Sequence, residues 1–310
     1  MLISIVIPAY KTLFLKKTIN SVLNQTFRDF ELIIVDDCSP HDIESIIIEY
    51  HDSRIRYYRN SKNCGAINVV DNWNICLDYA KGDFIMCIGD DDMLAATCLE
   101  DYKCMIMKYP HVDLFHSRVL QIDENDNPIN ISLQRAEYET ISSFLLHRFC
   151  GNLQFIGDFL FKTSKLRDFG GFYKLPLAWG SDDVSAFMVA RENGVVHINH
   201  PNFYYRVNRY TISQTGDIRI KLKAIELLRK WYDEFLPTIR TEDFSDQLTF
   251  QNIEKMLERV FIKKYAYVIA KDISRNLFNL VKWKMEANRY NLKDAVLFLG
   301  LLEALKLRKK

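Results

Sequence analysis

The chain has 310 residues, of which 48% are hydrophobic and 26% charged, as in an ordinary soluble globular protein. This length allows one large or two modest domains with a buried core. The formal net charge of +1 argues against a nucleic-acid partner, because the chain as a whole offers no positive field to a polyphosphate. Residues 1–216 carry an excess of acidic side chains and residues 217–310 an excess of basic ones, which predicts two functional parts.

Cysteine usage and hydrophobicity bear on the compartment. The seven cysteines are odd in number and form no C-x-x-C pair, which favours a reduced, cytoplasmic environment. A strand predicted at Ile3–Ile7 leaves no room for a signal peptide. The longest apolar stretch near the end, Ala295–Leu302, is too short to cross a bilayer. We therefore expect a cytoplasmic protein, soluble or peripheral at the inner face of the membrane.

The first 120 residues alternate short apolar runs with helix-periodic segments, which is typical of a parallel α/β sheet. Strands are predicted at Ile3–Ile7, Glu31–Val35, Ile55–Tyr58, Phe84–Ile88 and Val112–His116. Helices are predicted at Leu15–Asn24, Asp42–Tyr50, Val69–Ala80 and Ala95–Tyr109. A polar stretch from Ile122 to Glu139 predicts a loop or hairpin, a helix is expected from Asp183, and the pattern beyond Asp217 is helical.

Three consecutive carboxylates, Asp90, Asp91 and Asp92, follow the strand predicted at Phe84–Ile88, with Gly89 allowing the backbone to turn. Three such groups repel one another unless a cation shares the site. A hard divalent ion that also bridges to the phosphates of a ligand, Mg²⁺ or Mn²⁺, would satisfy them. The alternative is an acidic turn that caps the following helix, because aspartate is a good N-cap.

Two acidic pairs accompany this turn. Asp36 and Asp37 follow the strand at Glu31–Val35, where a carboxylate can accept hydrogen bonds from a ribose or a base. Asp182 and Asp183 open a helix, and capping is the alternative explanation for both pairs. Ligands of open α/β sheets bind beyond the carboxyl ends of the strands, so polar residues gathered there indicate a site.

Several short motifs occur in a fixed order along the chain. They are Ser4–Lys11, Ser21–Phe27, Phe30–Ser39, Asn63-Cys64-Gly65, Asn72-Trp73-Asn74, Ala80–Asp83, the triple aspartate, Gly170-Gly171-Phe172 and Asp182-Asp183. In this order, over residues 2–215, they resemble a family 2 glycosyltransferase of GT-A fold. The resemblance implies a Rossmann-like mixed α/β sheet flanked by helices. It also implies a catalytic domain at residues 1–216, followed by a helical region at 217–310.

The resemblance implies roles for individual residues. A nucleotide-sugar pocket would be lined by Pro8, Ala9, Tyr10, Asp36, Asp37, Asn63, Gly65 and Asp90. Asp91 and Asp92 would lie nearest the metal, Mn²⁺ or Mg²⁺, and Asp183 matches the catalytic base, with Asp182 as its pair partner. Trp179, in a loop next to a glycine, is a candidate for stacking on the acceptor.

Two positions depart from the family pattern. Gly89 replaces the first aspartate of the commonest D-x-D form. The family's Tyr-Arg-x-His motif ends here in Asn208, which leaves the last metal ligand open.

The expected reaction is an inverting transfer from a nucleotide-diphospho-sugar, UDP-linked, to a glycan or lipid-linked acceptor, as in bacterial surface polysaccharide synthesis. Such a transfer needs a base at the acceptor hydroxyl and neutralisation of the leaving diphosphate. The sequence lacks a Gln-x-x-Arg-Trp motif, which favours addition of a single sugar over polymerisation.

Alternatives remain for the function and for the tail. A sugar-1-phosphate nucleotidyltransferase needs a glycine-rich loop after the first strand, but Pro8–Thr12 contains no glycine. A non-catalytic nucleotide-sugar-binding protein of the same fold is the other alternative. In the tail, a basic end follows a set of apolar residues, Leu292, Val296, Leu299, Leu302 and Leu305. This face would lie on a membrane surface, pack on the catalytic domain, or form a homodimer.

Overall fold

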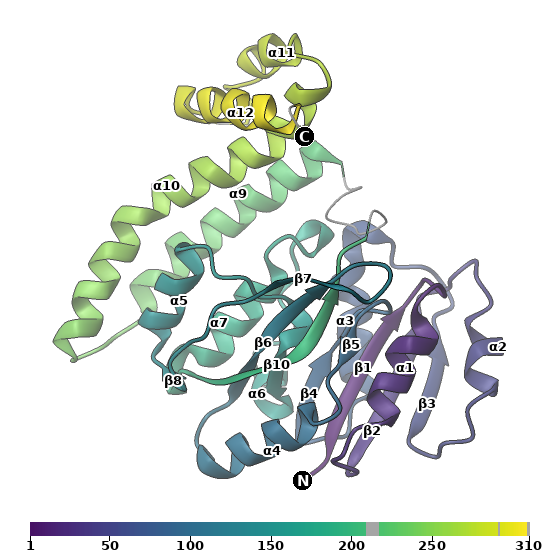
Figure 1. Cartoon of the computed structure of the whole chain (residues 1–310). Helices are drawn as coiled ribbons and strands as arrows, with labels where there is room; N and C mark the ends of the chain where they lie inside the picture. The colour runs from purple at the N-terminus through teal and green to yellow at the C-terminus, as the bar shows by residue number, and fades with distance from the viewer. Residues whose placement is uncertain (209–216, 291, 309–310) are drawn as a thin grey trace.

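The computed structural model describes residues 1–208, 217–290 and 292–308. Its centre is a mixed β-sheet with strand order β3-β2-β1-β4-β9-β6-β10-β5 (Figure 1). The first four strands in sequence are parallel and confirm the expected ones: β1 (Ile3–Ala9), β2 (Phe30–Asp36), β3 (Ile55–Arg59) and β4 (Phe84–Cys87). The side chains of β1, β2 and β4 are almost all buried because helices cover both faces of this part of the sheet, whereas β3 at the edge is half-buried.

The helices between these strands also confirm the expectations. They are α1 (Leu15–Leu23), α2 (Ile43–Ile48), α3 (Val69–Tyr79) and α4 (Cys98–Lys108). In α1, Leu15, Ile19 and Val22 are fully buried, at the i, i+4, i+7 spacing of one helix face. Each of these helices returns the chain across the sheet, so the strand ends that follow residues 9, 36 and 87 meet at one edge.

The second half of the sheet is not purely parallel. It contains β5 (Met93–Leu94), β6 (Leu114–Ile122), β7 (Pro128–Ile131), β8 (Tyr138–Glu139), β9 (Phe159–Lys162) and β10 (Val195–Arg206). Strand β9 lies antiparallel between β4 and β6, so the sheet is mixed. The strand expected at Val112–His116 begins at Leu114 and extends to Ile122, because β6 continues into a hairpin with β7.

Helices α5 (Ile141–Phe149), α6 (Thr163–Asp168) and α7 (Ser181–Asn193) cover the sheet beside this half. The tail is helical as expected, with α9 (Ile218–Phe235), α10 (Phe244–Arg275), α11 (Asn279–Met285) and α12 (Asp294–Leu307). Helices α9 and α10 run side by side away from the sheet, and α11 and α12 lie at their far end (Figure 1).

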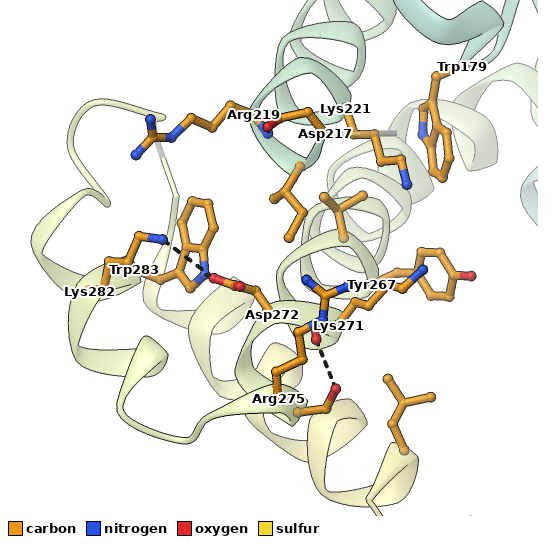
Figure 2. A pocket seen from close by; sticks show the side chains of 14 residues that line it. Trp179, Asp217, Arg219, Lys221, Tyr267, Lys271, Asp272, Arg275, Lys282 and Trp283 are labelled. Carbon is orange, nitrogen blue, oxygen red and sulfur yellow. Dashed lines mark hydrogen bonds and ion pairs between the residues drawn. The ribbon is translucent and has the colours of Figure 1, made fainter. Parts of the chain in front are cut away.

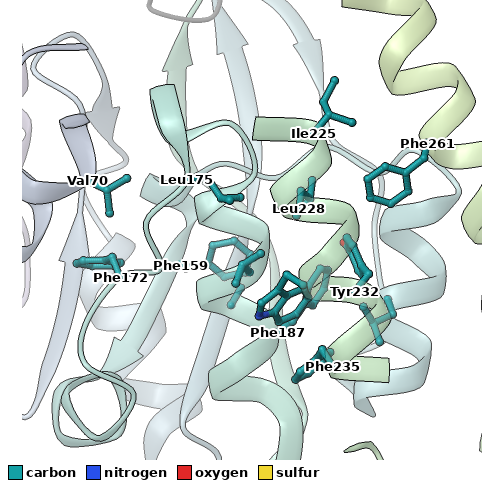
Figure 3. Close-up of a cluster of buried hydrophobic side chains, with 14 of the residues drawn as sticks. Val70, Phe159, Phe172, Leu175, Phe187, Ile225, Leu228, Tyr232, Phe235 and Phe261 are labelled. Carbon is teal, nitrogen blue, oxygen red and sulfur yellow. The ribbon is translucent and has the colours of Figure 1, made fainter. Parts of the chain in front are cut away.

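One buried apolar cluster joins the tail to the sheet (Figure 3). Phe187 of α7 packs against Tyr232 of α9, with ring centroids 6.3 Å apart, and Tyr232 packs against Phe261 of α10 at 5.8 Å. The C-terminal part of α9, around Tyr232, and the part of α10 around Phe261 therefore belong to the core that supports α7. This packing brings the tail next to the Asp182-Asp183 pair.

The apolar face expected on the last helix is divided. Leu292 and Val296 are buried, and Gly300 lies against Ile269 of α10, so this side packs on the protein. Leu302 and Leu305 are 39% and 41% exposed. In the described ranges, no helix is long and apolar enough to cross a membrane.

Candidate active site

A cavity of about 480 Å³ opens at the carboxyl ends of β1, β2 and β4. It brings together residues from segments far apart in the sequence, and nine of them are expected site residues: Pro8, Tyr10, Asp37, Asn63, Gly65, Asp90, Asp91, Asp92 and Asp182. The apolar part of its wall includes Phe155 and Tyr205, whose rings stack at 3.9 Å. Acidic groups around an open, partly apolar cavity are suited to a polar ligand together with a cation.

Asp90 connects the ends of β1 and β4. Its Oδ2 accepts hydrogen bonds from the backbone N–H groups of Tyr10 at 2.7 Å and Lys11 at 2.6 Å. Burial and the neighbouring Asp91 raise the pKa of Asp90 to about 6. The bonds hold the first strand's exit loop against the acidic turn.

Asp91 and Asp92 point back over Gly89. A Cβ at Gly89 would lie 2.8 Å from Asp92 Oδ2 and 3.0 Å from Asp91 Oδ1, so the two carboxylates occupy the space that a side chain would fill. Burial, followed by the charge of Asp91, raises the pKa of Asp92 well above its usual value. Gly89 thus permits two carboxylate oxygens to converge.

This pair fits a divalent cation. Among the described residues no three His, Cys, Asp or Glu side chains form a ready metal cage. Mg²⁺, however, is commonly held by one or two carboxylates together with substrate phosphates and water. Asp91 and Asp92 offer hard oxygen ligands in that number beside the cavity.

The end of β10 supports the acidic turn. Arg206, which is fully buried, donates its backbone N–H to Asp92 Oδ1 at 3.0 Å and its Nε to the Asp91 carbonyl at 2.8 Å. Its guanidinium lies 4.3 Å from the ring centroid of Phe14. Two residues later, Asn208 donates Nδ2 to Asp91 Oδ2 at 2.6 Å. The position where the family has histidine therefore contacts an expected metal ligand through an amide.

Asp37 is the acidic residue at the end of β2 that faces the cavity. Its Oδ1 accepts from Cys64 N and from Asn60 Nδ2, both at 2.9 Å. Asn63 donates Nδ2 to the Asp37 carbonyl at 2.6 Å, which ties the loop after β3 to the same strand end. Gly65 then turns with a φ of 76°, a value that favours glycine. Asp37 is thereby fixed with one oxygen engaged by protein.

Four expected site residues lie outside the cavity lining. Ala9 is fully buried in the sheet core. Asp36 is fully buried and accepts from Arg59, Tyr57 and the Ser39 N–H, so it holds the loop after β2 rather than a ligand. Trp179 lines a different cavity, beside α9 and α10. The fourth residue is Asp183.

Asp182 and Asp183 face different surroundings, because successive side chains on a helix point about 100° apart. Asp182 lines the cavity, and burial, with the charge of Asp183, raises its pKa to about 7. Asp183 is 1% exposed, and its Oδ1 accepts from Arg148 Nε and Gln154 Nε2, both at 2.7 Å. Asp183 therefore lies behind the cavity wall, where its carboxylate is paired with the Arg148 guanidinium. Asp182, in contrast, lines the cavity.

The segment that leads into α7 is strained. Leu177 and Ala178, at the end of the 3₁₀ turn Pro176–Ala178, have φ values of 60° and 52°, which are rare for residues with a side chain. Both line the cavity. Strain of this kind persists where the surrounding structure imposes it, often at functional sites.

Comparison with solved structures identifies the fold as that of GT-A glycosyltransferases. S. aureus TarS residues 1–349 in complex with UDP-GlcNAc superimposes with a TM-score of 0.68 at 14% identity, covering 100% of this chain and 92% of that one. The mannosyltransferase PcManGT from Pyrobaculum calidifontis, in complex with GDP-Man and Mn²⁺, gives 0.56 at 15% identity, covering 99% and 86%. At these identities the likeness concerns the fold.

The chain belongs to glycosyl transferase family 2, whose family model matches residues 4–158. A Campylobacter jejuni GalNAc(5)-diNAcBac-PP-undecaprenol beta-1,3-glucosyltransferase is 35% identical over 100 residues, 31% of this chain and 32% of the relative. An Escherichia coli UDP-Glc:alpha-D-GlcNAc-diphosphoundecaprenol beta-1,3-glucosyltransferase, WfgD, is 35% identical over 108 residues, 34% and 42% of the two chains. The matches thus span less than half of either relative.

Proposed function

We propose that this chain is a metal-dependent, inverting glycosyltransferase that moves one sugar from a UDP-linked donor to a hydroxyl of a glycan or lipid-linked acceptor. The observation that carries the proposal is the single 480 Å³ cavity that Asp37, the Asp90–Asp92 turn and Asp182 share. Family membership supports the reaction class.

We assign the binding of the donor nucleoside to the part of the cavity beside Asp37. One carboxylate oxygen of Asp37 is held by Cys64 and Asn60, which leaves the other to accept from a ribose or base donor. Pro8 and Tyr10 from the end of β1 line the same part of the cavity wall. Asp90 lines the same cavity and also fixes the backbone at Tyr10.

Asp91 and Asp92 would hold Mn²⁺ or Mg²⁺ together with the donor diphosphate. When bound, such an ion stabilises negative charge on a leaving phosphate oxygen. The carboxylates are held ready by Arg206 and Asn208. Lys11, whose Nζ lies 3.8 Å from Asp91 Oδ2, adds a positive charge at the same wall.

We assign the base at the acceptor hydroxyl to Asp182. The resemblance pointed to Asp183, but its contacts with Arg148 and Gln154 leave it in the wall, whereas Asp182 faces the cavity. A carboxylate with a pKa near 7 is matched to neutral pH, since it exists as the base and accepts a proton readily. Asp183 then acts as a positioning residue that holds the start of α7.

The names of two relatives support the proposed acceptor class and location. Two of them are named for undecaprenol diphosphate acceptors, which supports a lipid-linked substrate and a role in bacterial surface polysaccharide synthesis at the inner face of the membrane. Phe278 and Met285 beside α11 are each 81% exposed and suit contact with a membrane surface. We assign catalysis to residues 1–216 and acceptor or membrane contact to 217–310. Alternatively, the same exposed apolar surface would form the interface of a homodimer.

Calorimetric titration of UDP, GDP, CDP and UTP, each with Mn²⁺ and with EDTA, tests the proposal. We expect UDP to bind with Mn²⁺ and to lose most of its affinity in EDTA. Failure of every nucleotide to bind would favour a non-catalytic protein of the same fold. Gly89 and Asn208, which depart from the family pattern, agree with that alternative. Preference for UTP would favour a nucleotidyltransferase.

A further inference from the structure

A second cavity, of about 810 Å³, lies between α9, α10 and α11 (Figure 2). Its lining differs in charge from that of the donor cavity. Five of its side chains are cationic: Arg219, Lys221, Lys271, Arg275 and Lys282. Two are acidic, Asp217 and Asp272, and the indole rings of Trp179 and Trp283 complete much of the wall.

Both acidic groups have structural partners. Asp217 is the N-cap of α9, and its Oδ1 accepts from Arg219 N at 2.7 Å and Ile220 N at 3.3 Å. Asp272 Oδ2 accepts from Trp283 Nε1 at 3.0 Å and lies 3.6 Å from Lys282 Nζ. Two of the cations are thereby paired, Lys282 with Asp272 and Arg219 with Glu286, whose Oε1 lies 3.6 Å from Arg219 Nη2. Among the described lining residues, five cations still outnumber the two carboxylates.

Lys221 is the most enclosed of the cations. It is 4% exposed, and its Nζ lies 5.1 Å from the ring centroid of Trp179. Its pKa is lowered by burial and by the nearby charge of Lys271. The side chains of Lys221 and Lys271 line one cavity, where both ammonium groups would attract a bound anion.

The segment Leu177–Asp182 forms the partition between the two cavities. Leu177, Ala178 and Asp182 line the donor cavity, while Trp179 lines the basic one. Trp179 lies just before α7, so an anion beside Trp179 would contact the segment that carries the carboxylate to which we assign the base.

We propose that the basic cavity binds a phosphate or diphosphate group of the acceptor and so brings the acceptor hydroxyl to Asp182. This inference rests on the proposed function. The donor site and the acceptor site would bind phosphate in different ways. The donor diphosphate meets carboxylates and needs a divalent cation, whereas the acceptor phosphate meets lysine and arginine and needs none.

Titration with inorganic pyrophosphate in EDTA tests the site, because chelation removes metal-dependent binding at the donor cavity. We expect wild-type protein to bind pyrophosphate, with an affinity that falls as salt rises. Lys271→Gln and Arg275→Gln should each weaken binding at least about tenfold, as for a lost charge-assisted hydrogen bond. Lys263→Gln, an exposed lysine on the same helix outside the cavity, is the matched control and should bind like wild type.

Two results would overturn the inference: no pyrophosphate binding by wild type, or equal binding by Lys271→Gln, Arg275→Gln and Lys263→Gln. UDP titration with Mn²⁺ on the same samples separates this failure from failure of the proposed function, because UDP binding should survive in all three variants. Farnesyl diphosphate and glycerophosphate then distinguish the sources. Tighter binding of the former supports a lipid-linked diphosphate, and tighter binding of the latter supports a phosphate within a glycan.

Discussion

Arg148 of α5 and Asp183 of α7 form an ion pair with 2.7 Å between Nε and Oδ1. Asp183 is 1% exposed, and Gln154 donates to the same oxygen. The carboxyl next to it, on Asp182, faces the donor cavity. The pair therefore fixes the first turn of α7 and sets the direction of Asp182.

Removal of Arg148 should destabilise the protein. Arg148→Met would leave Asp183 buried without its cation, and breaking a buried pair in this way costs about 3–5 kcal/mol. Arg148→Lys, which keeps the charge, should lose less. Urea unfolding at pH 7 measures both variants, and an unchanged midpoint for Arg148→Met would show that the pair contributes nothing.

The transfer rate should rise with pH through about 7. Burial and the Asp183 charge raise the pKa of Asp182 to about 7, so the basic form of Asp182 becomes dominant only above that pH. The rising limb should appear in kcat/KM for the UDP-sugar. A profile without an inflection between pH 6 and 8 would remove Asp182 from the base role.

The Asp182 carboxyl should also make the free energy of unfolding fall as pH rises, whereas the transfer rate rises. Folded Asp182 keeps its proton up to pH about 7, whereas the unfolded chain releases it near pH 3.9. Between these values the native state binds more protons, so this group lowers the free energy of unfolding as pH rises. The wild-type decline between pH 4 and 7 should therefore exceed that of Asp182→Asn, and parallel curves would contradict the shift.

Gly89→Ala should disturb the expected metal ligands with little effect elsewhere. The new Cβ would lie 2.8 Å from Asp92 Oδ2 and 3.0 Å from Asp91 Oδ1, and both carboxylates would have to move. We expect Mn²⁺-dependent UDP affinity to fall at least about tenfold, because misplaced ligands no longer share the ion with the diphosphate. Full UDP affinity in this variant would place the ion elsewhere.

Asp91→Ala should abolish the difference between UDP titrations with Mn²⁺ and with EDTA. Its carboxylate is expected to share the cation with Asp92 and the phosphates, so its loss removes one of the two carboxylate ligands that we propose. Asp36→Asn is a useful comparison, because Asp36 is buried outside the cavity and should leave the metal dependence intact. An unchanged Mn²⁺ effect in Asp91→Ala would contradict the assignment.

The sequence predicted the parts of the site that depend on local pattern. Apolar runs ending in polar residues located the strand ends at Asp37 and Asp90, and parallel topology brought these ends to one edge. The sequence could not show which member of each acidic pair lines the cavity and which lies behind its wall. Asp36 is engaged by Arg59, and Asp183 by Arg148, 35 residues away, so their surroundings arise only from tertiary packing.

The role of Arg206 could not be predicted from the sequence either. Its place in the motif that ends in Asn208 was visible in the sequence, but not its burial or its bonds to Asp91 and Asp92, 115 and 114 residues earlier. Trp179 likewise sits near Asp182 in sequence yet faces the basic cavity, because the left-handed residues at 177 and 178 redirect the chain.

Release of UDP from UDP-sugars, measured for wild type, Asp182→Asn and Asp183→Asn at equal fractions folded, tests the central claim most directly. We predict Mn²⁺-dependent release by wild type and a loss of at least about 10²-fold in Asp182→Asn, with UDP affinity retained. Asp183→Asn should mainly lower stability. No release by wild type with any UDP-sugar, or near-normal release by Asp182→Asn beside a 10²-fold loss in folded Asp183→Asn, would contradict the account.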